Sequence, residues 1–400
     1  MHTWNGEPML LGRNFDDIDR TTIQGLVDAA ATESVHLDFK RETYGRTEDD
    51  KKEFLKDITA FANCLGGHLI IGIEEADGVA AALSPLAGID VDAELLRLES
   101  IARTGIEPSI IGLRMKRVPT ETGDLIIIHV PRSYNPPHRV ITRNSNRYYS
   151  RNSTGVFELS LEELRQLFGQ RRSIEERAKS FLGERHLRIQ ANDGPLRIPV
   201  EQGAVVLHLV PLPDFGADRR VEIEAIRAQR DNFPPLGAQP AIDRINLDGI
   251  VCSRGGDVCH GYTQIFRNGS VEATNASVIG NLGGGRALRT TAVAEQLIAA
   301  LSFYMRGLRA LDMSTPVLVQ ISFFGMSNVS MALPAEYFDP PPPYTRDELH
   351  LPPSVISDYQ IDDNYERFVA EQMDYLWNAY GFPRCDLFNG EGQWVGILRG

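Results

Sequence analysis

Three carboxylates stand beside two predicted strands near the start of the sequence. Glu33 precedes the strand in SVHLDFKR, Asp38 lies within it, and Glu75 directly follows the apolar run HLIIGI. If the two strands are neighbours in one sheet, the three acids can converge. Clustered carboxylates bind Mg²⁺ or Mn²⁺, which can neutralise a phosphate and activate water. The pattern therefore predicts metal-dependent phosphodiester cleavage, with Glu33, Asp38 and Glu75 as the metal ligands.

Two more side chains belong to this predicted site. Alternate residues of a strand face the same side, so Lys40 shares the face of Asp38 and can steady a phosphate or the departing oxygen. His36 lies on that face too, where it can carry a proton. Acids at strand ends also cap turns or contact water, so the spacing alone leaves a structural role open. Glu74 competes with Glu75 for the role of the third acid.

A basic and aromatic stretch lies between residues 132 and 151, and it contains no Asp or Glu. Its arginines can bind phosphates, and its tyrosines can stack on unpaired bases. The formal net charge of −13 disfavours undirected binding of polyanions, so this local cluster must provide the nucleic-acid contacts. A solvated hairpin is the alternative interpretation. The candidate nucleic-acid-binding residues are Arg132, Arg139, Arg143, Arg147, Tyr148, Tyr149 and Arg151.

Helices and strands alternate around these residues. Apolar residues at helical spacing predict helices over 16–31 and 48–64, the first capped by Thr21 or Thr22 and the second ended by a glycine pair. The apolar run HLIIGI predicts a buried central strand, and DLIIIHVPRS predicts another strand. The acids should therefore lie at the end of a sheet whose interior is apolar.

We expect an α+β protein with two main domains. The 400 residues are 42% hydrophobic and 24% charged, which is a globular composition. A helix capped by Ser160 closes the first domain, and the highly charged segment after it predicts an exposed connecting helix. The second domain combines strands such as VVLHLVPL with a long helix, and its fold is unassigned. The expected boundaries are 15–170 for the first domain, 171–190 for the linker helix, 191–338 for the second α+β domain, and 339–400 for a proline-rich spacer with a last helical segment.

The remaining composition bears on compartment and cofactors. Four scattered cysteines, no apolar run of bilayer length and no export signal predict a cytoplasmic protein with free thiols and no membrane partner. The sequence contains no Gly-x-x-x-x-Gly-Lys-(Ser/Thr) motif, so no ATP site is evident.

The segment ESVHLDFK, followed by AFANCLGGHLIIGIEE, resembles the signature of the Schlafen family and its AlbA-like bacterial relatives. The family pattern is an acid, a second acid followed by Phe-Lys, a helix ending Ala-Phe-Ala-Asn, a Gly-Gly turn and an apolar strand closing on an acidic pair. The resemblance covers residues 15–170 and implies a mixed sheet with helices. It also implies that Glu33, Asp38 and Glu75 bind the metal. Asp38 stands where relatives often have Glu, and Glu75 where they often have Asp, so metal affinity can differ.

The resemblance also implies an activity. Schlafen-like nucleases cleave transfer and ribosomal RNA with the help of a metal, and bacterial members resemble antiphage or growth-arrest effectors. The leading hypothesis is therefore a metal-dependent endoribonuclease that cleaves structured RNA such as tRNA. The alternative is a non-catalytic, DNA-binding transcription regulator with a C-terminal sensor domain. A homodimer, or a partner protein bound through the C-terminal domain, is compatible with either hypothesis.

Overall fold

The computed structural model divides into two compact units, Met1–Glu176 (unit 1) and Arg177–Gly400 (unit 2). Both combine helices and sheets, which confirms the expected α+β class. The structure describes residues 15–142, 145–217, 219–237, 242–254, 259–282, 284–332, 341–360 and 362–396.

A four-stranded mixed sheet forms the centre of unit 1. Strand β2 pairs with β1 in parallel and with β7 in antiparallel orientation, and β7 also pairs with β6. Every residue of β2 is buried, which confirms the central strand predicted from HLIIGI. In spatial order the strands are β1 (Leu37–Lys40), β2 (Gly67–Ile71), β7 (Asp124–Val130) and β6 (Arg114–Pro119).

Helices cover both faces of this sheet. On one face Ile126 and Ile128 of β7 pack in a core with α2 (Glu48–Ala62) and α3 (Val91–Gly105). On the other face the alternate residues of β7 share a core with α1 (Arg20–Asp28), which follows a 3₁₀ turn at Phe15–Asp17. This division follows from the two-residue period of a strand.

The cap of α1 differs from the prediction. Asp19, and neither Thr21 nor Thr22, is the N-cap, since its carboxylate accepts a hydrogen bond from the backbone N–H of Thr22 at 2.9 Å. The Thr22 hydroxyl accepts a hydrogen bond from the Asp19 backbone N–H in return, which completes a capping box. The helix therefore begins at Arg20. This start lies before the predicted caps Thr21 and Thr22 and after residue 16, where the apolar pattern begins.

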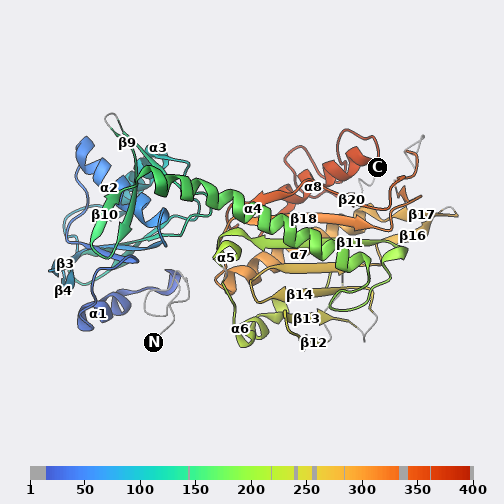
Figure 1. Cartoon of the computed structure of the whole chain (residues 1–400), viewed down its shortest axis with the longest axis horizontal. Helices are drawn as coiled ribbons and strands as arrows, with labels where there is room; N and C mark the ends of the chain where they lie inside the picture. Colours follow the sequence, from blue (N-terminus) through green and yellow to red (C-terminus); the bar gives the residue numbers. More distant parts are fainter. Residues whose placement is uncertain are drawn as a thin grey trace. The chain divides into compact units, whose positions relative to one another are not determined.

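The basic stretch forms part of a second, antiparallel sheet in unit 1. Asn63 at the end of α2 fixes this sheet, because its side-chain amide donates to the carbonyls of His138 and Tyr149 at 2.9 and 2.8 Å. Figure 1 shows α2 beside β9 and β10, as their contacts require. In spatial order the strands are β10 (Gly155–Glu158), β9 (Ser145–Asn152), β8 (Arg139–Thr142) and β5 (Ile106–Glu107), while β3 (Ile73–Ala76) and β4 (Val79–Leu83) form a separate hairpin.

The glycine turn between α2 and β2 is sterically required. Gly66 has φ of +72°, and a Cβ there would lie 2.4 Å from the backbone nitrogen of Arg132. The expected left-handed turn after α2 is therefore present, and it also allows the chain after β7 to pass close by.

A single helix, α4 (Leu161–Gln190), occupies the region where a closing helix and a separate linker helix were expected. It begins at a capping box formed by Ser160 and Glu163, with the Ser160 backbone N–H donating to the Glu163 carboxylate at 2.8 Å. The boundary between the units, Glu176 to Arg177, falls inside this helix.

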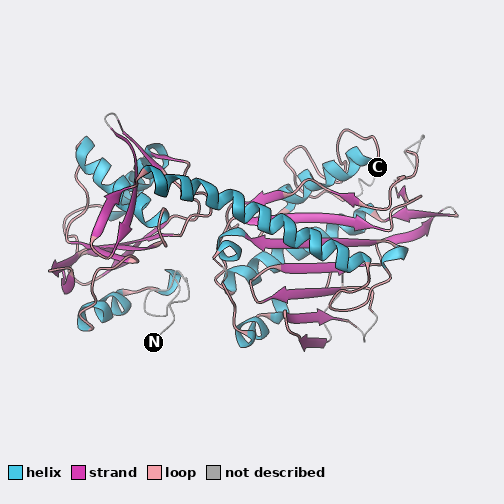
Figure 2. Ribbon diagram, in the orientation of Figure 1, coloured by secondary structure: helices cyan, strands magenta, loops and turns pink. Residues whose placement is uncertain are grey.

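Unit 2 is built on a wide antiparallel sheet (Figure 2). The strand predicted from VVLHLVPL is present as β11. In spatial order the strands are β12 (Ile242–Ile245), β13 (Gly249–Ser253), β14 (Tyr262–Phe266), β15 (Val271–Asn275), β11 (Ala204–Pro211), β18 (Val317–Phe324) and β20 (Leu349–His350), with β21 (Ser354–Ile356) also paired to β18. A smaller sheet contains β16 (Ile279–Leu282), β17 (Gly285–Leu288) and β19 (Ser330–Met331).

Two long helices cover one face of this sheet, and the end of α4 covers the other. Leu207 of β11 shares a core with α7 (Thr290–Ala310) and α8 (Glu366–Ala379). These two helices are the long helix and the last helical segment expected from the sequence. On the opposite face Val206 packs with Ile189 of α4. The shorter helices are α5 (Leu212–Gly216) and α6 (Ile223–Ala228), with 3₁₀ turns at Val200–Gln202 and Arg230–Asn232.

Part of the proline-rich spacer expected at 339–343 lies outside the described residues. Among the helices that the structure describes, none is long and apolar enough to cross a membrane.

Candidate active site

Glu33 and Glu75 meet at the turn between β3 and β4. The Glu33 backbone N–H donates to the carbonyl of Gly78 at 2.7 Å, and the Glu75 carboxylate accepts a hydrogen bond from the Gly78 N–H. The Glu33 side chain turns toward β1, where its Oε1 accepts the backbone N–H of Phe39 at 2.9 Å. The structure thus brings these two acids together beside the strand that carries Asp38.

Asp38 is buried between two cations. Its Oδ2 accepts a hydrogen bond from Lys40 Nζ at 2.7 Å, and its Oδ1 accepts one from Arg151 Nη2 at 3.1 Å. Lys40 does share a face with Asp38, as the strand period predicted. Arg151, which is 113 residues away in sequence, reaches the site because β9 packs against α2. Both carboxylate oxygens of Asp38 are therefore already engaged.

Three residues that the sequence analysis did not select complete this network. Asp57 of α2 lies 3.8 Å from Lys40 Nζ and accepts a hydrogen bond from the Tyr44 hydroxyl at 2.7 Å. The guanidinium of Arg151 lies 3.9 Å from the ring centroid of Phe61, also on α2. A signal existed for Asp57, because an acid three residues after Phe54 falls on the apolar face of the predicted helix.

The charges in this site shift one another's protonation. Burial raises the pKa of Glu33 above its ordinary value, and the nearby carboxylates of Asp38 and Glu75 raise it further, against the opposing effect of Lys40. Burial alone would lower the pKa of Lys40, but Asp57 and Asp38 raise it above its ordinary value. The site therefore contains a half-buried carboxyl group that takes up a proton readily, beside a lysine that stays charged.

The acids do not form a ready-made metal site. Among the described residues, no group of three or more His, Cys, Asp or Glu side chains is arranged to hold a metal ion. Both oxygens of Asp38 face Lys40 and Arg151, and one carboxylate oxygen of Glu33 is bound to a backbone N–H. A divalent cation would have to compete with these partners, so the observed arrangement fits one poorly.

The other candidate residues near the acids, Glu74 and His36, have partners outside the acid cluster. Glu74 lies 3.3 Å from Arg41, whereas the charge of Glu75 acts on Glu33. His36 Nδ1 lies 3.2 Å from the carbonyl oxygen of Gly66, and burial lowers its pKa. Of the two acids of the closing pair, Glu75 is thus the one that belongs to the cluster.

The predicted nucleic-acid-binding residues divide into surface and interior groups. Arg132, Arg139 and Arg147 lie at the surface or partly so, and the last two form ion pairs with Glu107 and Glu158.

Tyr148, which follows Arg147 in β9, is half-buried, and its ring centroid lies 6.2 Å from that of Phe168. Tyr149 and Arg151 are 7% and 5% exposed and point into the protein. Arg143 lies outside the described residues. Arg139 and Arg147 of the β8–β9 hairpin are therefore accessible to solvent at least in part, while Tyr149 and Arg151 lie in the interior, where Arg151 contacts Asp38.

No curated protein matches the chain. The DIP2311 protein from Corynebacterium diphtheriae is a similar solved structure, 19% identical, with a TM-score of 0.26, covering 36% of this chain and 27% of that one. The N-terminal domain of a RecG-related protein from Nitrosomonas europaea is also 19% identical, with a TM-score of 0.24, covering 29% of this chain and 74% of that one.

A family model described as Schlafen, AlbA_2 matches residues 33–160. The matched segment runs from Glu33 to Ser160 and contains every candidate site residue named above, from the three acids to Arg151. The match confirms the resemblance inferred from ESVHLDFK and AFANCLGGHLIIGIEE, and it indicates a nucleic-acid-related function for the matched residues. Residues 33–160 of this chain are therefore similar to the Schlafen, AlbA_2 family.

Proposed function

We propose that unit 1 binds structured RNA, such as transfer RNA, and cleaves its phosphodiester backbone. The observation that carries this proposal is the meeting of Glu33, Asp38 and Glu75 beside Lys40, with the pKa of Glu33 raised by burial and by the other two acids. Like charges gathered against a positive group are costly for stability and typical of sites that do chemistry.

The residues divide the work according to their surroundings. Glu33 accepts the proton of the water molecule that attacks the phosphorus atom, because a carboxylate with a raised pKa is the stronger base, and the bond from phosphorus to the leaving oxygen then breaks. Lys40, whose side chain is 31% exposed, places its charge where negative charge develops on the phosphate. Asp38 and Arg151 hold Lys40 and β1 in position.

Arg132, which precedes β8, and Arg139 and Arg147 of the β8–β9 hairpin bind the RNA backbone in this proposal. Arg132 is exposed, and the ion pairs of Arg139 and Arg147 are surface pairs, which phosphates can replace at little cost. Tyr148 directly follows Arg147 and is paired with Arg139 across the hairpin, and it offers part of its ring for stacking on an unpaired base.

Mg²⁺ or Mn²⁺ remains part of the proposal as the expected cofactor. Since Asp38 is engaged by Lys40 and Arg151, cation binding requires at least one of these partners to release an oxygen. A cytoplasmic location and a role in antiphage defence or growth arrest accompany the proposal, as does assembly into a dimer, or with a partner protein, through unit 2.

Glu33→Gln is the sharpest test. The amide oxygen of glutamine can still accept the Phe39 N–H, so the fold is kept while the base is removed. The full chain is incubated with transfer RNA and with duplex DNA, in Mn²⁺, Mg²⁺ or EDTA. We expect cleavage of the RNA with either metal, lost in EDTA, and slowed about 100-fold or more in Glu33→Gln.

Glu74→Gln is the matched control, because Glu74 is the neighbouring acid that pairs with Arg41 outside the cluster. It should cleave like the wild type, whereas Glu75→Gln should not. Equal cleavage by Glu33→Gln, Glu75→Gln and the wild type would overturn the proposed roles.

A non-catalytic DNA-binding regulator is the second candidate function. The engagement of both Asp38 oxygens by cations favours it, because such an acid stabilises a fold without needing a metal. This function predicts tight binding of duplex DNA, unaffected by EDTA or by Glu33→Gln, and no cleavage of either nucleic acid.

A further inference from the structure

Unit 2 contains a cavity of about 800 Å³ that plays no part in the function proposed for unit 1. Four segments distant in sequence line it: the last turns of α4, α5 with the residues after it, the β12–β13 turn, and the end of β14 with its following turn. Six of the lining residues are arginines and only two, Glu184 and Asp248, are acids. The arginines are Arg177, Arg185, Arg188, Arg219, Arg220 and Arg267.

Two of these arginines are structural. Arg185 is 4% exposed and donates two hydrogen bonds to Glu272 of β15, at 2.7 and 2.9 Å. Arg219 donates to Asp214 at 3.0 Å and also binds backbone carbonyls of residues 311 and 312. Both charges are balanced by buried acids, so they form the rigid wall of the cavity.

Other arginines keep their charge available. Arg220 is exposed, and neither it nor Arg267 forms an ion pair with a carboxylate in the part of the chain that the structure describes. The Arg267 Nε donates to the carbonyl of Leu247 at 3.3 Å, which orients the guanidinium and leaves its outer nitrogens to a ligand. Arg188 pairs with Glu184 at 2.8 Å, but both side chains are exposed, so an incoming anion can replace the acid.

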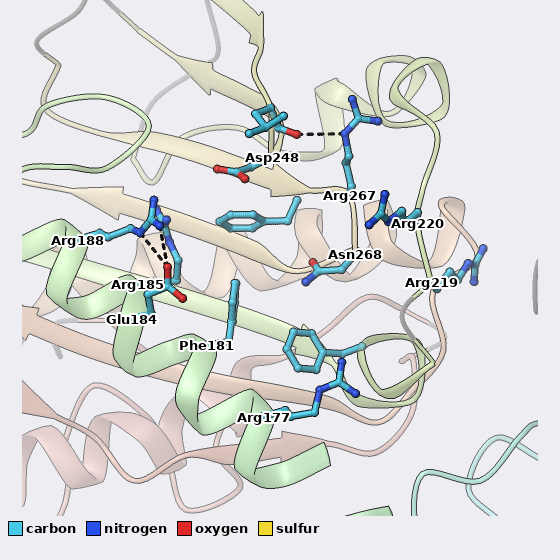
Figure 3. Close-up of a pocket in the computed structure, with 13 residues that line it drawn as sticks. Arg177, Phe181, Glu184, Arg185, Arg188, Arg219, Arg220, Asp248, Arg267 and Asn268 are labelled. Carbon is cyan, nitrogen blue, oxygen red and sulfur yellow. Dashed lines mark hydrogen bonds and ion pairs between the residues drawn. The ribbon is translucent and has the colours of Figure 1, made fainter. Parts of the chain in front are cut away.

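Aromatic rings complete the cavity. The ring centroid of Phe181 on α4 lies 5.5 Å from that of Phe215 and 5.4 Å from that of Phe266. The other two rings are buried, while Phe181 is partly exposed. Figure 3 shows Phe181 between Arg177 and Arg185, with Arg220 and Arg267 on the far side of the opening. The partly exposed ring of Phe181, inclined at 55° and 83° to the two buried rings, is thus surrounded by guanidinium groups.

We infer that this cavity binds a free nucleoside di- or triphosphate. Arginine binds phosphate oxygens with two parallel hydrogen bonds, and an aromatic ring accepts the face of a base. The volume lies within the range of small-ligand sites. Since the chain has a net charge of −13, a long polyanion is repelled beyond the cavity, whereas a compact one stays within a lining of six arginines and two acids. No glycine-rich phosphate loop is needed, because side chains supply the donors.

The test uses the full chain and isothermal titration with ATP, GTP, inorganic triphosphate and adenosine. We expect one binding site per chain for ATP or GTP, weaker binding of triphosphate and little binding of adenosine. In Arg188→Gln/Arg220→Gln, where both exposed side chains can change without disturbing the core, affinity for ATP should fall about tenfold for each lost contact. Arg267→Gln should lower it again.

Two variants make the result specific. Phe181→Leu should weaken ATP but leave inorganic triphosphate unchanged, because only the base contacts the ring. Arg367→Gln is the matched control, since this exposed arginine of α8 does not line the cavity, and it should bind ATP like the wild type.

Several outcomes would overturn the inference. One is the absence of binding of every phosphate compound, and another is unchanged ATP affinity in the arginine variants. A third is binding of single-stranded RNA that depends on these arginines and is not displaced by ATP, because it would assign the cavity to a macromolecule.

Discussion

Asp38 is a buried acid whose charge is balanced by Lys40 and Arg151, and this pairing decides what its replacement does. The side chains of Asp38 and Arg151 are 11% and 3% exposed. Among the described residues, the Nε and Nη1 of Arg151 have no hydrogen-bond partner, so this cation depends on Asp38. Removing the acid leaves a positive charge in the interior with only the ring of Phe61 against it.

We therefore expect Asp38→Asn to lower the free energy of unfolding by about 3 kcal/mol. Urea denaturation followed by circular dichroism measures the loss. Arg147→Gln is the control, because its ion pair with Glu158 is exposed and should contribute less than about 1 kcal/mol. An Asp38→Asn protein as stable as Arg147→Gln would contradict the buried pair. The double change Asp38→Leu/Arg151→Met should recover much of the loss, since it removes both charges.

The connection between α2 and β2 is the most constrained element of unit 1. A Cβ at Gly66 would lie 2.4 Å from the Arg132 nitrogen and 2.8 Å from the Val130 carbonyl oxygen, both of which are backbone atoms that cannot move alone. Gly88 provides a matched comparison, because its φ is +77° and no atom lies within 4 Å of its Cβ position.

Gly88→Ala should cost about 1 to 2 kcal/mol, the usual penalty of a left-handed backbone. Gly66→Ala should cost more, because a steric conflict adds to the same penalty. Thermal denaturation of the two variants measures the difference. Equal melting temperatures would show that the chain after β7 is not held against this turn.

Local patterns predicted the elements of unit 1 better than its contacts. The strand of HLIIGI, the helix over 48–64 and the glycine turn follow from periodicity and backbone preference, and all three are present. The pairing of Asp38 with Arg151 depends on how two sheets pack around α2, which no local pattern encodes. The same applies to the cavity of unit 2, since its arginines come from four separate segments.

The apolar pattern of the sequence also did not predict the length of α4. Residues 161–190 are so highly charged that their apolar residues do not define one continuous stripe, and a break into two helices was expected. The end of the helix instead buries isolated residues, Leu182, Arg185 and Ile189, against the sheet of unit 2. Tertiary contacts, and not helix periodicity, therefore account for its last turns.

At the scale of the molecule, a buried acid links the stability of unit 2 to pH. Burial alone would raise the pKa of Glu272, but hydrogen bonds from Arg185 and His208 lower it to about 2. The folded state therefore holds a proton less tightly than the unfolded state, whose carboxyl has the ordinary value of 4.5. The resulting stabilisation is complete above pH 4.5 and is lost as the pH falls toward 2.

We expect wild type and Glu272→Gln to differ by about 3 kcal/mol near pH 6 and by much less near pH 2. Tryptophan fluorescence during urea unfolding is a suitable probe, because Trp377 and Trp394 both lie in unit 2. Glu371→Gln, a change at an exposed acid, should leave the curve unchanged. A difference that stays constant across this pH range would rule out the assigned linkage.

The four cysteines are unequal as chemical handles. Cys252, Cys259 and Cys385 are at most 4% exposed, and burial raises the pKa of each thiol, so little thiolate is available for alkylation. Cys64 is only partly buried, and its Sγ donates to the carbonyl of Arg151 at 3.3 Å. A thiol-reactive fluorophore or spin label therefore attaches first at Cys64, next to the Arg151 that binds Asp38. The label can then report on the region where nucleic acid is proposed to bind.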